Sequence, residues 1–270
     1  MMSSNGVSYR VSGAGEPAIV FVHGFACAQE DWRAQVDALS GQFRCVTLDL
    51  PGHGASAKPP AATLRGLGDA VNEVRGLIGA NKVILVGHSL GAKVIREAYG
   101  AMPEGVAGLV FIDGAFYDGD RETMFARASS AIDSHGFAAY ALGHFDSMFT
   151  EKSDPELKQR IVARAAGLDP EFGRALYLEA VTWDPARGKQ TLQELAVPAL
   201  VLQSTHIGSD LVRRPMQPGM MTSFMALVTE LAAQSEAKVV AGIGHFTMNE
   251  AADEVNALIR DFATRAAQAG

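Results

Sequence analysis

One stretch decides how this chain folds: Lys82-Val-Ile-Leu-Val-Gly-His-Ser-Leu-Gly-Ala92. Its first half, residues 82–86, is short, apolar and β-branched, which is typical of a buried strand. The five residues Gly87 to Gly91 match the pattern G-x-S-x-G and lead into a predicted helix over residues 92–101. Glycines two positions either side of Ser89 permit a tight turn with strained backbone angles at the serine. The hydroxyl of Ser89 is therefore predicted at the carboxyl edge of a sheet.

Outward from this stretch, short apolar runs alternate with helical patterns. Apolar residues recur every three or four positions over residues 64–78 and again over 255–262, which predicts two amphipathic helices. Such alternation predicts an α/β fold, with a mostly parallel central sheet and helices on both faces. The further predicted strands are 18–22, 44–48, 108–112, 197–202 and 237–241.

The middle of the chain has a different pattern. Residues 115–190 favour several short helices, with breaks expected at Gly136, Pro155, Gly167-Leu-Asp-Pro170 and Asp184-Pro185. Ten of the chain's 20 aromatic residues lie in this segment, and aromatic rings supply large apolar contact areas. We therefore predict a core made of residues 1–114 and 191–270, interrupted by a helical cap over 115–190.

Composition limits the partners. The 270 residues are 48% hydrophobic, and the net charge of −7 leaves no basic excess for binding nucleic acid. The first apolar run, Ala18 to Val22, is too short for a signal peptide or a membrane span. The two cysteines, Cys27 and Cys45, cannot make a disulfide framework. These features predict a cytoplasmic protein that binds neither nucleic acid nor membrane.

A serine hydroxyl needs a base to remove its proton. His245 stands in Gly242-Ile-Gly-His-Phe246, between the last predicted strand and the last helix. It is therefore expected at the same sheet edge as Ser89. His135, His144 and His206 lack such a context and are expected on the surface or in the cap.

Four segments in this order resemble the α/β-hydrolase superfamily, and the likeness covers nearly the whole chain. They are His23-Gly24-Phe25, Asp49-Leu-Pro-Gly-His-Gly54, the turn around Ser89, and Gly244-His245-Phe246 with Glu250. The resemblance implies that the Phe25 N–H stabilises an oxyanion beside the Leu90 N–H, which opens a helix. It also implies that His23, Asp49 and His53 shape loops.

The acid that orients His245 has two candidates. The resemblance places it after the penultimate strand, where Asp210 is available but comes several residues late. Some members of the superfamily use a carboxylate after the preceding strand instead, and Asp113 directly ends that strand. We favour Asp113 and keep Asp210 as the alternative.

These parts predict a metal-independent serine hydrolase without a cofactor. Its substrate would be a small hydrophobic ester or lactone, cleaved through an acyl-enzyme on Ser89. The acyl pocket is expected to be apolar, with lining residues Phe25, Met124, Phe125, Phe145 and Met148.

Other functions stay open. A dehalogenase or epoxide hydrolase would need aspartate at position 89, and the chain has no H-x-H-x-D-H run for a metal-dependent lactonase. An acyl-homoserine lactone hydrolase, a carbon–carbon-bond hydrolase and a cofactor-free haloperoxidase share the serine. A small-molecule receptor with an idle triad is the alternative from another class. Arg213-Arg214 is expected in a solvated loop, although it could meet a substrate carboxylate.

Overall fold

Residues 1–208, 210 and 212–268 are described by a computed structural model, in which seven strands form one sheet ordered β1-β3-β2-β4-β5-β6-β9. β1 (Tyr9–Ser12) runs antiparallel to β3, and all other neighbours are parallel. The predicted mostly parallel sheet is confirmed, and β1 is an additional strand. The other strands are β2 (Ala18–Val22), β3 (Arg44–Leu48), β4 (Val83–His88), β5 (Val106–Ile112), β6 (Ala199–Gln203) and β9 (Ser235–Val239).

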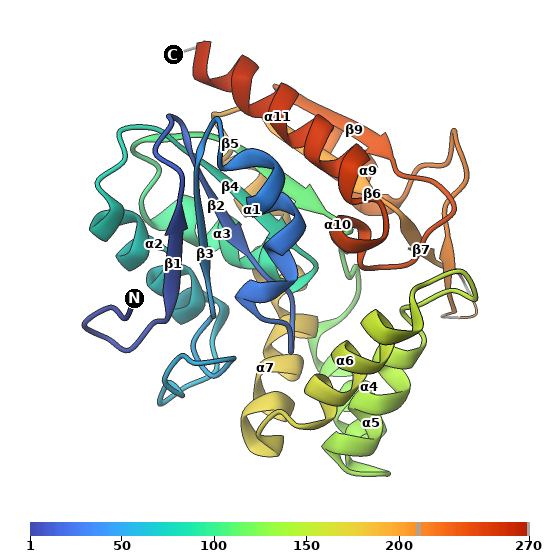
Figure 1. The fold of residues 1–270 in the computed structure, drawn as a ribbon. Helices are drawn as coiled ribbons and strands as arrows, with labels where there is room; N and C mark the ends of the chain where they lie inside the picture. The colour runs from blue at the N-terminus through green and yellow to red at the C-terminus, as the bar shows by residue number, and fades with distance from the viewer. Residues whose placement is uncertain (209, 211, 269–270) are drawn as a thin grey trace.

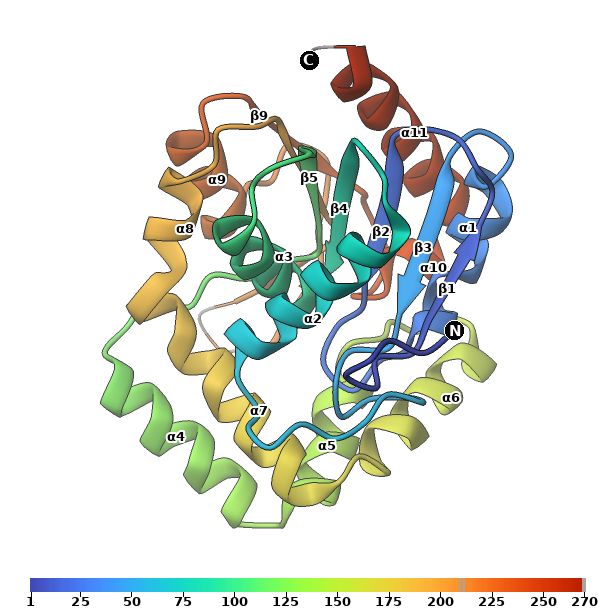
Figure 2. The same cartoon turned by 90° about the vertical axis from the view of Figure 1, so that its left-hand side faces the viewer.

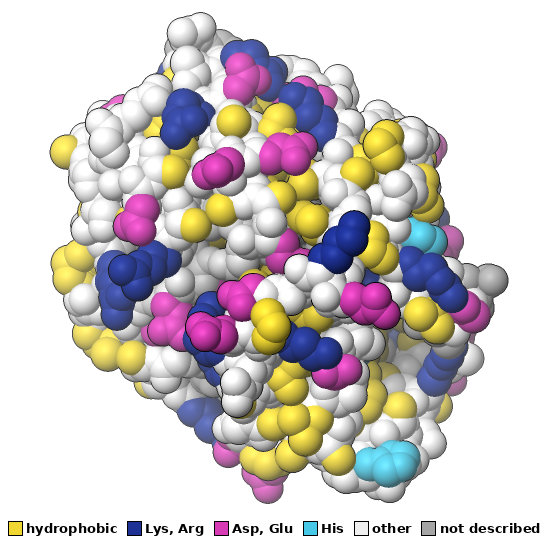
Figure 3. Space-filling model, turned by 45° about the vertical axis from the view of Figure 1, so that its right-hand side comes forward, with side chains coloured by type: hydrophobic (Ala, Val, Ile, Leu, Met, Phe, Trp, Pro, Cys, Tyr) yellow, Lys and Arg dark blue, Asp and Glu magenta, His cyan; other side chains and the backbone are white. Residues whose placement is uncertain are grey.

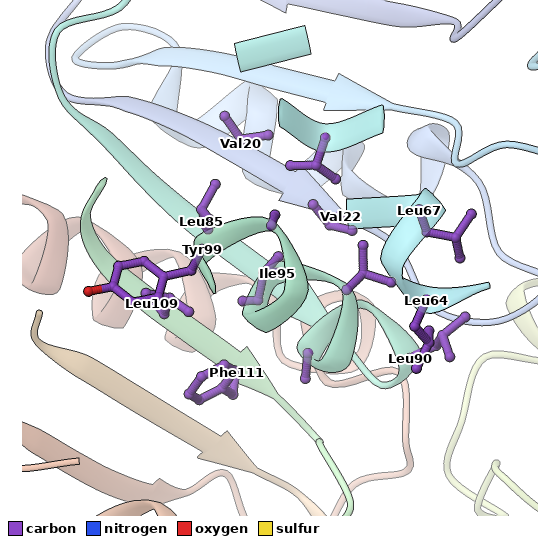
Figure 4. Close-up of a cluster of buried hydrophobic side chains, with 14 of the residues drawn as sticks. Val20, Val22, Leu64, Leu67, Leu85, Leu90, Ile95, Tyr99, Leu109 and Phe111 are labelled. Atoms are coloured by element: carbon purple, nitrogen blue, oxygen red, sulfur yellow. The ribbon is translucent and has the colours of Figure 1, made fainter. Parts of the chain in front are cut away.

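Helices cover both faces of the sheet (Figures 1 and 2). One face carries α2 (Leu64–Ile78), α3 (Leu90–Ala101) and α9 (Ser223–Leu231), and the other carries α1 (Arg33–Leu39) and α11 (Ala252–Gln268). Figure 4 shows part of the first interface, where Ile95 of α3 lies near Leu85 of β4, and Val20 of β2 lies beyond Leu85 in the same cluster. These side chains are fully buried, so hydrophobic burial holds α3, and with it the turn at Ser89, against the sheet.

The predicted helix over 64–78 matches α2 at both ends. The Thr63 hydroxyl accepts a hydrogen bond from the Gly66 N–H at 3.1 Å and caps its start. Gly79 adopts a left-handed conformation (φ 60°) and ends it. Leu67, Val71 and Val74 are buried on one face, as the spacing of apolar residues predicts.

A run of helices connects β5 to β6. In Figures 1 and 2, α4 to α7 gather beyond one end of the sheet. Gly136 precedes α5 and Pro155 opens α6, as expected, but no break occurs at Asp184-Pro185. The chain changes there from an α-helix to the π-helical turn η2 and so stays helical into α8. These elements are α4 (Arg121–Asp133), α5 (Phe137–Asp146), α6 (Pro155–Ala166), α7 (Pro170–Trp183), η2 (Asp184–Gly188) and α8 (Lys189–Gln193).

Short elements near the carboxyl ends of the strands were not predicted. They are η1 (Gln29–Trp32), the hairpin of β7 (Thr205–Ile207) and β8 (Arg213–Pro215), and α10 (Thr247–Glu250). Three- or four-residue elements are too short to show a hydrophobic period.

The surface is mixed in charge. On the face drawn in Figure 3, acidic and basic side chains are interspersed. Among the described residues, no helix combines the length and apolar character that a membrane crossing requires.

Candidate active site

Ser89 occupies a strained turn between β4 and α3. Its backbone has φ 53° and ψ −115°, a region that L-residues rarely adopt. A Cβ on Gly87 would lie 2.4 Å from the Gly91 oxygen, and a Cβ on Gly91 would lie 2.3 Å from the Val22 oxygen. Only glycine fits at both positions. The Ser89 N–H also donates to the Ile112 oxygen at 2.9 Å, which ties the turn to β5.

His245 and Asp113 are in direct contact. His245 Nδ1 lies 2.6 Å from Asp113 Oδ2, and both side chains are buried. Donation of the Nδ1 proton to the carboxylate leaves Nε2 as the basic nitrogen. Ser89 and His245 line the same cavity. The three residues predicted as nucleophile, base and favoured acid are therefore brought to one place.

Residues that follow β6 donate hydrogen bonds to the Asp113 carboxylate. Its Oδ1 accepts hydrogen bonds from the N–H groups of Ser204 and Thr205, both at 2.8 Å, and its Oδ2 accepts one from the Thr205 hydroxyl at 2.5 Å. Burial alone would raise the pKa of Asp113, but the hydrogen bond from His245 and the charges of His245 and Arg213 lower this pKa to about 2. Asp113 is thus an ionised carboxylate at neutral pH.

The pKa of His245 is lowered from its usual value. Burial disfavours the imidazolium most, and the positive charge of Arg213 disfavours it further, while Asp113 acts in the opposite direction. The ring is consequently neutral at pH 7 and able to accept a proton.

Asp210, the alternative acid, lies elsewhere. Its carboxylate is exposed and pairs with the neighbouring Arg214, with Oδ2 2.6 Å from Nη2. The contact with His245 belongs to Asp113 because Asp113 directly follows β5 at the sheet edge, whereas Asp210 lies in the connection between β7 and β8.

The two expected oxyanion donors line the cavity beside Ser89. Leu90 is the first residue of α3, so its N–H belongs to the helix's first turn and has no intrahelical partner. A Cβ on Gly24 would lie 3.2 Å from the Ser89 Cβ. The loop that carries Phe25 therefore runs directly over the serine.

Hydrogen bonds hold that loop in place. His23 Nε2 accepts from the Leu50 N–H at 2.9 Å, and His53 Nε2 accepts from the Ala26 N–H at 3.2 Å. Asp49 Oδ1 accepts from the Gln29 N–H at 2.8 Å. These bonds tie the segment that follows β2 to the segment that follows β3, which agrees with the loop-shaping role inferred for the three residues.

Of the expected acyl-pocket residues, some line the cavity and some do not. Phe25, Phe145 and Met148 line it, together with Tyr177 of α7. Met124 and Phe125 are not among the residues that line this cavity. Ile132 is the buried residue of α4, whereas the Phe125 side chain is 48% exposed. The helix therefore packs through its last turns and turns its first half outward.

The sequence analysis missed polar cavity residues. Lys93 lies one helical turn after Ser89, is buried, and pairs with Asp184 of η2. His144 of α5, expected only in the cap or on the surface, also lines the cavity. Lys93 comes four positions after Ser89, in the first turn of the helix that the serine's turn opens, and this spacing is the signal that identifies the lysine as a neighbour of the site.

The position of Arg213 differs from the solvated loop expected for it. Its side chain is only 12% exposed and lines the cavity, so it does not belong to a solvated loop. Arg214 is the exposed member of the pair. Successive side chains on a strand point to opposite sides, so the three-residue strand β8 separates the two arginines.

A metal ion and a cysteine thiolate are two further groups that can carry out catalysis. Among the described residues, no cluster of three or more His, Cys, Asp or Glu side chains could hold a metal ion. Cys27 borders the cavity, but burial, with the nearby Asp31 charge, raises the pKa of its thiol to about 12. Cys27 is therefore a protonated thiol and a poor nucleophile.

The chain belongs to the alpha/beta hydrolase family, whose model matches residues 19–258. Similar solved structures include an esterase from Thermogutta terrifontis (TM-score 0.79, 23% identity, 96% of this chain and 93% of that one). An enol-lactonase from Burkholderia xenovorans LB400 has a TM-score of 0.78 at 22% identity, covering 97% and 98% of the two chains. Est816, described as an N-acyl homoserine lactone degrading enzyme, has a TM-score of 0.78 at 21% identity, covering 95% and 96%. These likenesses show the shared fold.

Among curated sequences, the chain is 28% identical to an uncharacterized protein of Mycobacterium tuberculosis over 136 residues. The match covers 50% of this chain and 40% of that relative. The matched region thus spans less than half of the relative's length.

Proposed function

We propose that this protein is a serine hydrolase that cleaves carboxylic esters or lactones of small acyl groups. The observation that carries the proposal is the cavity shared by Ser89, on its strained turn, and the hydrogen-bonded pair of His245 and Asp113. A nucleophile beside a base that a third group orients is the arrangement that acyl transfer needs.

In the proposed mechanism, His245 Nε2 takes the proton of Ser89 as the serine oxygen attacks the substrate carbonyl. The N–H groups of Phe25 and Leu90 stabilise the oxyanion, and each such donor contributes about 10²–10³-fold in rate. The alcohol then leaves with the proton from His245. Water, deprotonated by the same base, hydrolyses the acyl-enzyme and restores Ser89.

The size of the cavity limits the size of the acyl group that a substrate can have. Its volume is about 60 Å³, and its apolar walls include Phe25, Phe145 and Met148. A short acyl group fits this space, whereas a longer one requires movement of the helices between β5 and β6. A small ester or lactone is the substrate that best matches it.

The structural neighbours include an esterase and two lactone-cleaving enzymes. Their activities favour ester or lactone cleavage as the reaction of this protein. Acyl-homoserine lactone hydrolysis is the more specific alternative, and the small cavity argues for short acyl chains in that case. Carbon–carbon-bond hydrolysis and haloperoxidase chemistry would use the same serine.

The test is pre-steady-state hydrolysis of 4-nitrophenyl butyrate. The wild-type protein should release a burst of nitrophenol that matches the enzyme concentration, and Ser89→Ala should abolish both burst and turnover. Ser134→Ala, at the exposed end of α4, is the matched control and should behave as wild type. Equal rates for the wild type and Ser89→Ala would contradict the proposal, and tight ligand binding without turnover would favour the receptor alternative.

A further inference from the structure

Arg213 presents unused hydrogen-bond donors at the cavity. Its Nη1 donates to the Thr205 hydroxyl at 2.7 Å and lies 3.3 Å from His245 Nδ1. Among the described residues, neither Nε nor Nη2 of Arg213 has a hydrogen-bond partner, and neither atom is among the fully buried unpaired ones. One edge of the guanidinium is therefore free for a ligand.

The charge of Arg213 is only partly balanced. Within the part of the chain that the structure describes, Asp113 is the carboxylate within 4.0 Å of it, at 3.5 Å. That carboxylate already accepts hydrogen bonds from His245, Ser204 and Thr205. Lys93, the other cation at the cavity, has its own partner in Asp184. A largely buried cation whose counter-ion is shared with other donors favours the entry of an anion.

Catalysis makes this imbalance more costly. When His245 takes the serine proton it becomes an imidazolium, with Arg213 Nη1 3.3 Å from its Nδ1. Two positive groups at this distance repel each other strongly in a closed cavity. An anion bound to the free edge of Arg213 would weaken that repulsion at the step where the charge on His245 appears.

We propose that Arg213 binds a carboxylate of the substrate, which makes the substrate class short half-esters of dicarboxylic acids or lactones that carry a carboxylate. The Nε and Nη2 groups form the planar pair of donors that matches a carboxylate in two parallel hydrogen bonds. This inference rests on the proposed hydrolase function. The reaction stays a hydrolysis: a bond forms between Ser89 Oγ and the acyl carbon, the alcohol leaves with its proton, and water releases the dicarboxylate.

The experiment compares the monoethyl and diethyl esters of succinate, glutarate and adipate, with hydrolysis followed by pH-stat at neutral pH. For at least one chain length, wild-type kcat/KM should favour the half-ester by about tenfold or more, the effect of a charge-assisted pair of hydrogen bonds. Arg213→Gln should remove this preference, by raising KM and lowering kcat for the half-ester, and should slow the diester less than the half-ester. Arg213→Lys should retain part of the preference, because lysine keeps the charge but loses the planar donor pair.

Arg214→Gln is the matched control. It removes the adjacent arginine, which is exposed and paired with Asp210, and should keep the wild-type preference. A wild-type protein that hydrolyses diesters as well as half-esters would overturn the inference. An equal loss for both esters in Arg213→Gln would show a purely structural role and would also overturn it.

A binding measurement separates this inference from the proposed function. Calorimetry with glutarate should show binding to Ser89→Ala and at least about tenfold weaker binding to Ser89→Ala with Arg213→Gln. Serine-dependent hydrolysis of 4-nitrophenyl butyrate without a half-ester preference or glutarate binding would leave the hydrolase proposal standing and reject the carboxylate site. Glutarate binding that depends on Arg213, without serine-dependent hydrolysis, would do the reverse.

Discussion

His245 Nδ1 lies 2.6 Å from Asp113 Oδ2, although the two residues are 132 positions apart in the chain. The carboxylate follows β5, and the backbone that leaves β6 bonds it through Ser204 and Thr205. The residues that follow β6 therefore donate hydrogen bonds to the carboxylate that contacts His245, and the carboxylate itself comes from the end of β5. A buried carboxylate that accepts several hydrogen bonds has little freedom to rotate, so it holds the imidazole in one orientation.

This geometry predicts unequal effects for the two candidate acids. Asp113→Asn should lower kcat for 4-nitrophenyl butyrate by about 10³–10⁴-fold, because the amide favours the wrong imidazole tautomer and cannot stabilise the imidazolium. Asp210→Asn removes only an exposed pair with Arg214 and should change kcat by less than about twofold. Steady-state kinetics of both variants check this. A large loss in Asp210→Asn with little change in Asp113→Asn would refute the assignment.

The acid limb of the pH–rate profile should lie below pH 6.5. Burial and Arg213 lower the pKa of His245, so the base stays neutral into mildly acidic solution and activity falls only as the pH drops through that lowered pKa. His88 and His144 at the same cavity have pKa values lowered to about 3, mainly by burial, and Asp113 stays ionised. A single ionisation, that of His245, is therefore expected on this limb above pH 4.

The matching variant is Arg213→Gln, assayed with a neutral ester from pH 4 to 8. Removal of the guanidinium should move the acid limb to higher pH, because one of the groups that repel the imidazolium is gone. A wild-type inflection above 6.5, or a limb that stays in place in the variant, would be inconsistent with this account. The Arg214→Gln profile should coincide with that of the wild type.

The buried ion pair between Lys93 and Asp184 should matter for stability. Both side chains are nearly inaccessible, and Asp184 Oδ1 also lies 3.6 Å from Arg96 Nη2. Asp184→Asn leaves two buried cations facing each other and should lower the free energy of unfolding by about 3–5 kcal/mol. Lys93→Met should cost less, since Asp184 keeps Arg96.

Urea unfolding followed by far-ultraviolet circular dichroism measures both changes. Lys58→Met is the control, because Lys58 forms an exposed pair with Asp169 at 2.8 Å and should contribute less than about 1 kcal/mol. A larger loss in Lys93→Met than in Asp184→Asn would argue against Asp184 as the shared counter-ion.

Much of the fold can be predicted from local sequence patterns, whereas the candidate site can be predicted only in part. Glycine spacing around Ser89 and apolar spacing in α2 are local signals, and the structure reproduces both turn and helix. His245 was placed by its position after a strand. Asp113 and Asp210 both follow strands, so sequence alone could not decide between them; the short hairpin of β7 and β8 turns Asp210 outward. The opposite orientations of Arg213 and Arg214 depend on the same hairpin.

The aromatic residues between β5 and β6 show a second limit. Their abundance predicted an apolar lining, but which rings face the cavity depends on how each helix is rotated. Phe145 is buried at the cavity, with its ring centroid 6.2 Å from that of Phe25, whereas Phe125 is exposed. A helix with a weak apolar stripe, such as α4, gives no reliable face from sequence.

This difference yields a prediction for acyl-chain length. Phe145→Ala should enlarge the cavity and raise the ratio of kcat/KM for 4-nitrophenyl octanoate to that for the acetate by about tenfold, since each accommodated methylene contributes about 0.8 kcal/mol. Phe125→Ala removes the same ring from an exposed position and should leave the ratio unchanged. Phe145→Ala also creates a cavity that costs about 3–5 kcal/mol of stability, so circular dichroism must first show that it is folded.

Tyr177→Ala provides a second test with a smaller folding cost, because Tyr177 is only partly buried, although it lines the same cavity and its ring lies 5.8 Å from that of Phe25. It should shift the chain-length ratio in the same direction. If Phe125→Ala alone shifted the ratio, substrate would have to enter over α4, and the cavity beside Ser89 would not be the acyl site. If both cavity variants fold and keep the wild-type ratio, the acyl chain must extend away from the helices between β5 and β6.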